Sequence, residues 1–240
     1  MKLLKLTLDS AAANVALDEA LLEEAEHGRA KGELLRLWQP AETVAVLGRS
    51  SPAATEVNME LCRQDGIPVI RRCSGGATIL TAPGCLMYAV VLGYESNPQL
   101  RMLDFAHRFV MQKIQQAILN RGVETGFQGT CDLTIDNRKV SGNALRCKKN
   151  YLVYHGTLIC DEFDLELIPK YLGTPKRQPD YRRQRQHQDF LTRIPVSTTE
   201  LSNALQETWN CDETISDWPQ DAVEKLVTEK YGLHEWNFKI

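Results

Sequence analysis

The sequence lacks the features that mark several large classes of protein. Its 240 residues include seven cysteines, an odd number, and these are scattered without a C-x-x-C pair. This pattern argues against a disulfide framework and against a zinc site. No apolar run approaches the length of a membrane span, and a net charge of −3 gives no sign of a nucleic-acid-binding surface. The first residues also lack the long apolar segment of a signal peptide. We therefore expect a cytoplasmic protein that binds neither nucleic acid nor membrane.

Composition and patterning indicate an ordinary globular chain. Hydrophobic residues make up 43% and charged residues 25%, which is typical of such proteins. The predicted strands outnumber the helices and often follow one another directly, which favours an α+β fold with a mixed, mainly antiparallel central sheet flanked by helices. No linker divides the chain, so we predict a single domain over residues 1–240, with a core of about 1–195 and helices over about 196–240 packed on it. We expect a monomer, because no large apolar surface is readable.

Periodicity and turn residues predict the order of the elements. Helices are expected over about 11–26, 58–65, 105–118, 198–209 and 219–230, and strands over 3–8, 34–38, 43–47, 67–70, 86–92, 132–135 and 152–160. We expect 67–70 and 86–92 to form a central hairpin. Residues 174–190 are dense in Arg, Gln and Pro, and predict a surface loop.

The stretch between these two runs carries the first functional signal. Arg71 and Arg72 lead into Ser74-Gly75-Gly76-Ala77-Thr78. Tandem glycines let a backbone approach a ligand, and exposed N–H groups can cradle an anion. Arginines beside them supply forked donors suited to phosphate or carboxylate. The alternative is a glycine-requiring hairpin turn with solvated arginines.

Two further polar clusters follow. They are Lys139-Val140-Ser141-Gly142-Asn143-Ala144 and His155-Gly156-Thr157-Leu158. The order R-R-x-S-G-G, K-V-S-G-N-A, H-G-T-L resembles that of the lipoate–protein ligase family, within the biotin/lipoate ligase superfamily. The resemblance spans roughly residues 10–190, and also takes in Asn14 and the helix after it. It implies the central-sheet fold shared with biotin protein ligases and related to class II aminoacyl-tRNA synthetases.

The resemblance implies an enzyme that attaches lipoate to protein. Such a ligase forms lipoyl-AMP from lipoate and ATP, with Mg²⁺ accompanying the ATP, and no protein-bound metal is expected. The lipoyl group then moves to a specific lysine of a carrier. The implied carriers are lipoyl domains of 2-oxoacid dehydrogenase E2 subunits, the glycine-cleavage H protein, or both.

The resemblance also assigns roles to residues. Lys139 is expected to be catalytic, with its ammonium stabilising charge that grows as AMP departs; the alternative is a solvated surface lysine. The expected nucleotide contacts are Arg72, Ser74, Gly75, Gly76, Ala77, Thr78, Asp132, Lys139, Ser141, Gly142, Asn143 and Ala144. The expected substrate contacts are Arg49, Arg71, His155, Gly156 and Thr157. For Asp132 a strand-start carboxylate in a local turn is an equal alternative, for Arg49 a surface charge, and His155 is expected to support the pocket rather than to catalyse.

The sequence departs from the family pattern at three places. Ala77 stands where ligases commonly carry a third glycine, and Thr81-Ala82 stand where they carry a His-Asp pair, which puts ATP handling in doubt. Only residues 195–240 follow Ile194, where two-domain ligases continue into an accessory domain. The chain could make the adenylate alone, need a separate accessory subunit, or use pre-activated acyl groups.

Two other functions stay open. Octanoyltransferases and lipoyl amidotransferases pass the acyl group through a cysteine thioester, for which Cys85 and Cys131 are the candidates, although buried, inert cysteine is the commoner case. The other possibility is a non-catalytic relative that binds a lipoyl group or a carrier domain.

The cationic groups of the 174–190 segment suggest an interaction surface. They are Arg177, Arg182, Arg183, Arg185 and His187. Lipoyl domains tend to be acidic, so this segment could dock them. The alternative is a solvated loop without a partner.

Overall fold

The fold is built around an eight-stranded sheet, in a computed structural model that describes residues 1–30, 32–175 and 178–240. Its strand order is β11-β1-β2-β6-β10-β9-β8-β7. The first two neighbouring pairs, β11–β1 and β1–β2, are parallel, and all the others are antiparallel. The strands are β1 (Lys2–Lys5), β2 (Leu34–Trp38), β6 (Cys85–Gly93), β7 (Gly126–Gln128), β8 (Asp132–Ile135), β9 (Arg138–Cys147), β10 (Tyr151–Ile159) and β11 (Glu213–Thr214).

A second, three-stranded sheet lies beside the first. It consists of β3 (Val44–Leu47) flanked by β4 (Val69–Arg71) in parallel and by β5 (Ile79–Thr81) in antiparallel orientation. The predicted hairpin between 67–70 and 86–92 is therefore wrong, because β4 and β6 belong to different sheets. The prediction failed because β5 is only three residues long and follows the glycine-rich stretch without a period-2 signal of its own.

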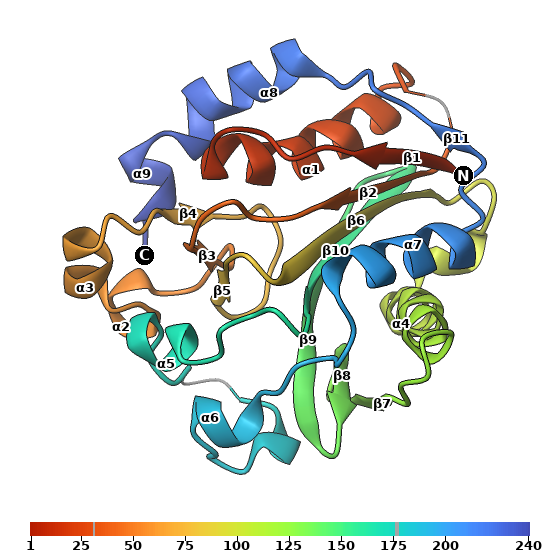
Figure 1. Cartoon of the computed structure of the whole chain (residues 1–240). Helices are drawn as coiled ribbons and strands as arrows, with labels where there is room; N and C mark the ends of the chain where they lie inside the picture. The colour runs from red at the N-terminus through yellow and green to blue at the C-terminus, as the bar shows by residue number, and fades with distance from the viewer. Residues whose placement is uncertain (31, 176–177) are drawn as a thin grey trace.

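Helices cover both faces of the large sheet, as Figure 1 shows. α1 (Ala11–Glu26) and α8 (Gln220–Leu226) lie on one face, and α4 (Leu103–Leu119) and α7 (Thr198–Thr208) on the other. Alternate residues of β6 point into the two cores: Tyr88 and Val90 pack on the α4 side, Ala89 and Val91 on the α1 side. The expected α+β fold is confirmed. None of the helices in the described ranges is long and apolar enough to cross a bilayer.

Short helices surround the small sheet and the chain ends. They are α2 (Ala53–Glu56), α3 (Met59–Gln64), η1 (Pro98–Arg101), α5 (Leu167–Tyr171), η2 (Asp180–Arg182), α6 (His187–Phe190), the π-helical turn η3 (Val227–Tyr231) that continues α8, and α9 (His234–Asn237).

The 174–190 segment differs from the predicted surface loop. It contains η2 and α6, and it buries Arg182, His187 and Phe190. The Arg182 guanidinium lies 4.6 Å from the Phe190 ring centroid, and long arginine stems can cover apolar surface in this way. The docking surface predicted for this segment loses Arg182 and His187 to the interior, whereas Arg183 is exposed. Arg177 lies outside the described residues.

Local capping and turn signals are confirmed. The Ser10 side chain accepts a hydrogen bond from the Ala13 amide at the start of α1, and Ser197 and Glu200 form a capping box at the start of α7. Asp136 and Asn137 have φ of 49° and 61°, which closes the tight β8–β9 hairpin. This hairpin places Lys139 at the start of β9.

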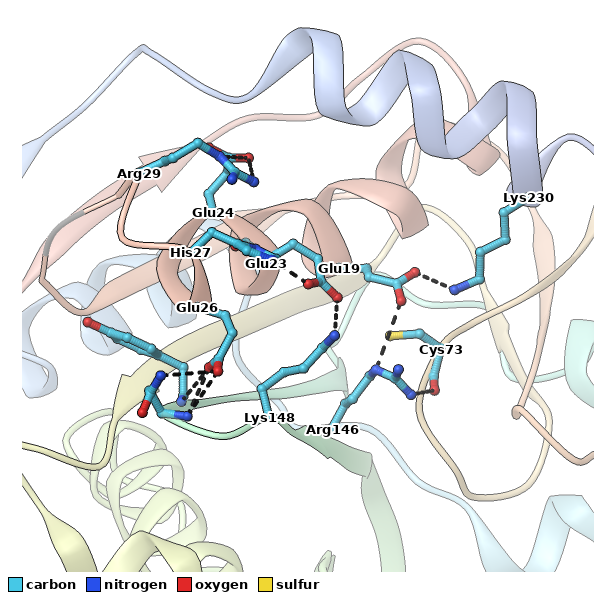
Figure 2. Close-up of polar contacts among 12 residues, drawn as sticks. Glu19, Glu23, Glu24, Glu26, His27, Arg29, Cys73, Arg146, Lys148 and Lys230 are labelled. Atoms are coloured by element: carbon cyan, nitrogen blue, oxygen red, sulfur yellow. Dashed lines mark hydrogen bonds and ion pairs between the residues drawn. The ribbon is translucent and has the colours of Figure 1, made fainter.

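Ion pairs tie α1 to distant segments (Figure 2). Glu19 lies between Lys230, with 2.5 Å between carboxylate and ammonium, and the more distant Arg146 of β9 at 3.9 Å. One turn later, Glu23 pairs with Lys148 at 2.5 Å. These contacts fix α1 against the β9–β10 hairpin. The other side chains of α1 are therefore held at fixed positions relative to β10.

The turn that joins the two sheets can be tested by a substitution at Gly84. This glycine has φ of +90°, and a β-carbon there would lie 2.3 Å from the backbone nitrogen of Phe163. We expect Gly84→Ala to lower the free energy of unfolding by about 3 kcal/mol or more, because an unfavourable dihedral and a backbone clash add up. Urea denaturation measures the loss.

The matched control is Gly122→Ala. Gly122 has φ of +80° but has open space around a β-carbon, so it should lose only about 1 kcal/mol, the cost of the dihedral alone. Equal losses in the two variants would contradict the clash at Gly84.

Candidate functional site

A large cavity lies between the two sheets. It contains about 1330 Å³ of empty space, a figure that includes its opening to solvent. The walls come from both sheets, α1, α2 and the chain after β10. The lining residues are Val15, Asp18, Trp38, Val46, Glu56, Arg72, Gly76, Ala77, Thr78, Ile79, Leu80, Met87, Lys139, Gly142, Asn143, Ala144, His155, Gly156, Thr157, Ile159, Ile168, Leu172, Gly173, Pro175, Pro179, Arg182, His187, Phe190 and Leu191.

Most of the predicted site residues meet at this cavity. Those that line it are Arg72, Gly76, Ala77, Thr78, Lys139, Gly142, Asn143, Ala144, His155, Gly156 and Thr157. Those that do not are Arg49, Arg71, Ser74, Gly75, Asp132 and Ser141. The second and third motifs meet because β9 and β10 pair in antiparallel register, which sets Ala144 opposite His155 and Gly142 opposite Thr157.

Lys139 is held at the cavity by an ion pair. Its ammonium lies 2.7 Å from one carboxylate oxygen of Asp132, and the hydroxyl of Tyr181 donates to the other at 2.7 Å. Asp132 thus contacts Lys139 instead of lining the cavity as a nucleotide contact. Gly142 lies beside this side chain, since a β-carbon there would be 3.8 Å from the Lys139 ammonium, an ordinary van der Waals distance. The arrangement presents an oriented point charge to the cavity.

The Arg72 guanidinium shapes the loop of the first motif. Its three nitrogens donate to the Ser74 hydroxyl at 3.1 Å and to the carbonyls of Val46 at 3.1 Å, Gly75 at 2.5 Å and Ala77 at 3.0 Å. Burial lowers the pKa of Arg72 to about 10, so the group stays charged at neutral pH. In this arrangement Arg72 fixes the glycine-rich backbone that lines the cavity.

The Thr78 end of this loop is occupied by a carboxylate. One oxygen of Glu56 accepts from the Thr78 amide at 2.9 Å and from the Thr78 hydroxyl at 2.6 Å. A carboxylate at this position shows that the Thr78 amide and hydroxyl together can bind an anion. Among the described residues, no group of three or more His, Cys, Asp or Glu side chains is placed to hold a metal ion.

His155 belongs to a buried polar network. Its Nδ1 lies 2.8 Å from Asp18, and its Nε2 lies 2.6 Å from the Ser74 hydroxyl. The other Asp18 oxygen accepts from Arg36 at 2.7 Å. The carboxylate at Nδ1 favours a proton on that nitrogen, and the Ser74 hydroxyl lies at Nε2.

This network positions His155 and is not a nucleophilic centre. Ser74 is buried and does not line the cavity, so its hydroxyl is not presented to a substrate. Burial by itself would raise the pKa of Asp18, but its hydrogen bonds and ion pairs with His155 and Arg36 outweigh burial and lower it. His155 lines the cavity and is held there by these contacts.

Asn143 and Gly156 fit together across β9 and β10. A β-carbon at Gly156 would lie only 1.9 Å from the Asn143 side-chain oxygen. That oxygen accepts from the Tyr88 hydroxyl at 2.6 Å, and the Asn143 amide donates to the Ser141 hydroxyl at 2.8 Å. The glycine is therefore required for the Asn143 side chain to keep this position.

Arg71 and Arg49 lie away from the cavity. The Arg71 side chain is fully buried and donates to carbonyls of Gly48 at 2.7 Å, Ser51 at 2.8 Å and Asn237 at 2.8 Å. It therefore joins β4 to the chain near the carboxyl terminus. Arg49 is exposed. Neither arginine lines the cavity, and the substrate role expected for both stays a prediction.

Sequence reasoning missed several residues of the site. Asp18 lies one helical turn after Asn14 on α1, and a buried carboxylate on that face was the available signal. Glu56 gives no signal of its own, because only the fold brings α2 to Thr78. Thr81, which stands where the family carries a histidine, is buried on β5 and does not line this cavity.

The two candidate cysteines are not activated. Cys85 is fully buried, and burial raises the pKa of its thiol to about 12. Burial also raises the pKa of the Cys131 thiol to about 11, with the nearby Asp132 adding to the effect. Neither residue lines the cavity. A reactive cysteine needs the opposite environment, one that lowers the pKa.

Comparison with known proteins identifies curated relatives along most of the chain. A probable lipoate-protein ligase A of Mycoplasma genitalium is 31% identical over 240 residues, which cover 94% of this chain and 68% of that relative. The octanoyltransferase LipM of Halalkalibacterium halodurans is 24% identical over 262 residues, which cover 94% of each.

Solved structures share the fold. A bi-partite lipoate protein ligase from Thermoplasma acidophilum, described with its E2 lipoyl domain, has a TM-score of 0.82, with 21% identity over 99% of this chain and 95% of that one. A lipoate-protein ligase A bound with ATP also has a TM-score of 0.82, with 21% identity over 99% of this chain and 98% of that one.

A family model places the chain. The model of the lipoyl protein ligase A/B catalytic domain matches residues 10–220. The expectation of an enzyme of this class is confirmed by that match together with the named relatives. The chain belongs to the lipoyl protein ligase A/B catalytic-domain family.

Proposed function

We propose that residues 1–240 form one catalytic unit that activates lipoate with ATP and transfers the lipoyl group to a lysine of a carrier domain. In the first step the lipoate carboxylate attacks the α-phosphate of ATP, and pyrophosphate leaves. In the second, the acceptor amine attacks the carbonyl of lipoyl-AMP, and AMP leaves. Both steps depend mainly on positioning and on charge stabilisation.

The observation that carries this proposal is the position of Lys139. Its ammonium is held by Asp132 at 2.7 Å, and it lines the same cavity as the Gly76–Thr78 loop. A fixed positive charge there suits the oxygen that joins an acyl carbonyl to a phosphate, where negative charge develops as AMP leaves. The apolar lining from Val15, Met87 and Ile79 suits an acyl chain.

ATP and Mg²⁺ are proposed as the activating pair. An ATP-bound structure exists for a fold neighbour, and the Thr78 amide and hydroxyl at the end of the Gly76–Thr78 loop bind the Glu56 carboxylate, so this position can bind an anion. Mg²⁺ is commonly held by substrate phosphates together with one or two carboxylates. Glu56 and Asp18 are the carboxylates of the described cavity wall.

The proposed acceptors are lipoyl domains of E2 subunits or the glycine-cleavage H protein, and a monomer is proposed for the free chain. The fold neighbour from Thermoplasma acidophilum is bi-partite and was described with an E2 lipoyl domain. This supports a lipoyl-domain acceptor, and it also supports a separate accessory subunit. The chain spans about two thirds of the length of the Mycoplasma genitalium relative.

A second candidate is an ATP-independent octanoyl or lipoyl transferase. It is favoured by the match to an octanoyltransferase over 94% of both chains. The two candidate cysteines, Cys85 and Cys131, speak against a thioester route through them, because burial raises the pKa of both thiols.

Lys139 provides the direct test. We expect Lys139→Ala to lower the rate of lipoyl transfer by about 10²–10³-fold, the usual effect of removing one group that stabilises a developing charge. The assay is intact-mass detection of a lipoylated lipoyl domain after incubation with lipoate and Mg-ATP. The matched control is Lys149→Ala, which removes an exposed lysine from the β9–β10 turn. Unchanged transfer by Lys139→Ala would contradict the proposed role, and wild-type transfer only from an octanoylated or lipoylated protein donor would favour the second candidate.

The cysteine variants separate the two candidate functions. Cys85→Ser and Cys131→Ser should each retain most of the ATP-dependent activity, because neither thiol lines the cavity. Loss of activity in a folded variant, with an acyl group trapped on the wild-type cysteine, would support the thioester route instead. Circular dichroism and intact mass establish folding and trapping.

A side chain added at Gly48 is expected to displace the glycine-rich loop. A β-carbon at Gly48 would lie 1.8 Å from the carbonyl oxygen of Gly76. We expect Gly48→Ala to weaken ATP binding by about tenfold or more, as for loss of a charge-assisted hydrogen bond, measured by calorimetry. Gly75→Ala is the control, because a β-carbon there meets nothing within 4 Å. Equal ATP affinities in the two variants would show that the loop does not bind the nucleotide.

A further inference from the structure

Arg182 is a buried cation with an open hydrogen-bonding group at the cavity. Its side chain lines the cavity and the residue is only 3% exposed. Its Nε donates to the carbonyl of Arg185 at 2.9 Å, but its NH2 nitrogen is buried and has no partner among the described residues. No carboxylate of the described chain forms an ion pair with it. Buried charge of this kind is costly unless an opposite charge joins it.

The other cations of the cavity wall are already engaged. Lys139 is paired with Asp132, and both terminal nitrogens of Arg72 donate to backbone carbonyls. Arg182 is thus the one arginine or lysine, among the described residues that line the cavity, with a terminal nitrogen that has no acceptor. Burial lowers the pKa of Arg182, but arginine titrates so far above neutral pH that the group remains charged.

Arg182 is held on the Lys139 side of the cavity. The adjacent Tyr181 donates to Asp132, the partner of Lys139. The Arg182 guanidinium stacks on Phe190, and the next residue, Leu191, forms a β-bridge with Lys139. The guanidinium plane is therefore fixed by packing next to Lys139, with its NH2 nitrogen left without an acceptor.

We propose that Arg182 binds an anionic oxygen of the substrate, either of the nucleotide phosphates or of the acyl carboxylate. A planar guanidinium with a free terminal nitrogen matches both groups in geometry and charge. The proposal deepens the proposed function, because it takes the same cavity as the substrate site. It assigns a binding role to a residue outside the three motifs that first indicated the site.

The test is equilibrium binding to Arg182→Met, which keeps the apolar stem and removes the charge. The ligands are Mg-ATP with adenosine as its uncharged counterpart, and lipoate with lipoamide as its counterpart. We expect affinity for at least one anion to fall about tenfold or more, with affinity for its neutral counterpart unchanged. Loss confined to Mg-ATP assigns Arg182 to the phosphates, and loss confined to lipoate assigns it to the carboxylate. The matched control is Arg183→Met, which removes an exposed arginine at the next position and should bind every ligand as the wild type does.

Three results would overturn the proposal. One is binding of both anions by a folded Arg182→Met within twofold of wild type. Another is an equal loss for anions and neutral counterparts, which would indicate packing instead of charge. The last is a wild-type protein that prefers neither anion over its counterpart.

Thermal unfolding without ligand distinguishes an arginine that binds a ligand from one that stabilises the fold. Because an unpartnered buried cation is replaced by an apolar chain, Arg182→Met should melt at or above the wild-type temperature. If that variant does not fold, Arg182→Lys decides: a loss of about threefold or more in anion affinity supports the forked contact, and unchanged affinity overturns it. Anion binding that depends on Arg182 without any lipoyl transfer by the wild type would leave this inference standing and remove the proposed function.

Discussion

Irregular backbone beside a cavity needs hydrogen-bond donors, and two buried arginines supply them. Arg71 donates to carbonyls of the Gly48–Ser51 loop and of Asn237, and Arg72 to carbonyls on either side of the glycine-rich loop. Unsatisfied carbonyls at these positions would each cost on the order of 1–3 kcal/mol. Of the two side chains that most resemble phosphate ligands in the sequence, Arg72 thus holds the loop that lines the cavity, and Arg71 joins β4 to the chain near the carboxyl terminus.

The Lys139 ammonium is the counterpart of that framework. Asp132 fixes it from β8, and Tyr181 fixes Asp132 from the chain after β10. The charge is therefore defined by two segments almost fifty residues apart, and not by its own strand. By contrast, the nearby Cys131 thiol is kept in its neutral form, because burial raises its pKa. The chemistry that this cavity can support is accordingly one of fixed charge and positioning.

The sequence was sufficient for the fold class, for most elements and for the meeting of the second and third motifs. It was not sufficient for the direction of side chains. Arg71 and Arg72 are both arginines that precede the same glycines. Only the fold determines that their guanidinium groups donate to carbonyls. Glu56 reaches Thr78 through a contact that no local pattern encodes, and the polarity of residues 174–190 concealed how far the arginine stems are buried. These are effects of long-range packing, which propensity and periodicity do not contain.

The pairing of β9 with β10 has a consequence for how the chain tolerates change. Lys139–Ala144 and His155–Thr157 are kept in step by the ladder that sets Ala144 against His155, not by the residues between the strands. The turn around Lys149 can lengthen or shorten without moving either motif, because it lies beyond the paired region. One residue inserted within either strand would instead reverse the faces of every side chain beyond it. Insertions and deletions are therefore tolerated in the turn of this hairpin but not within its two strands.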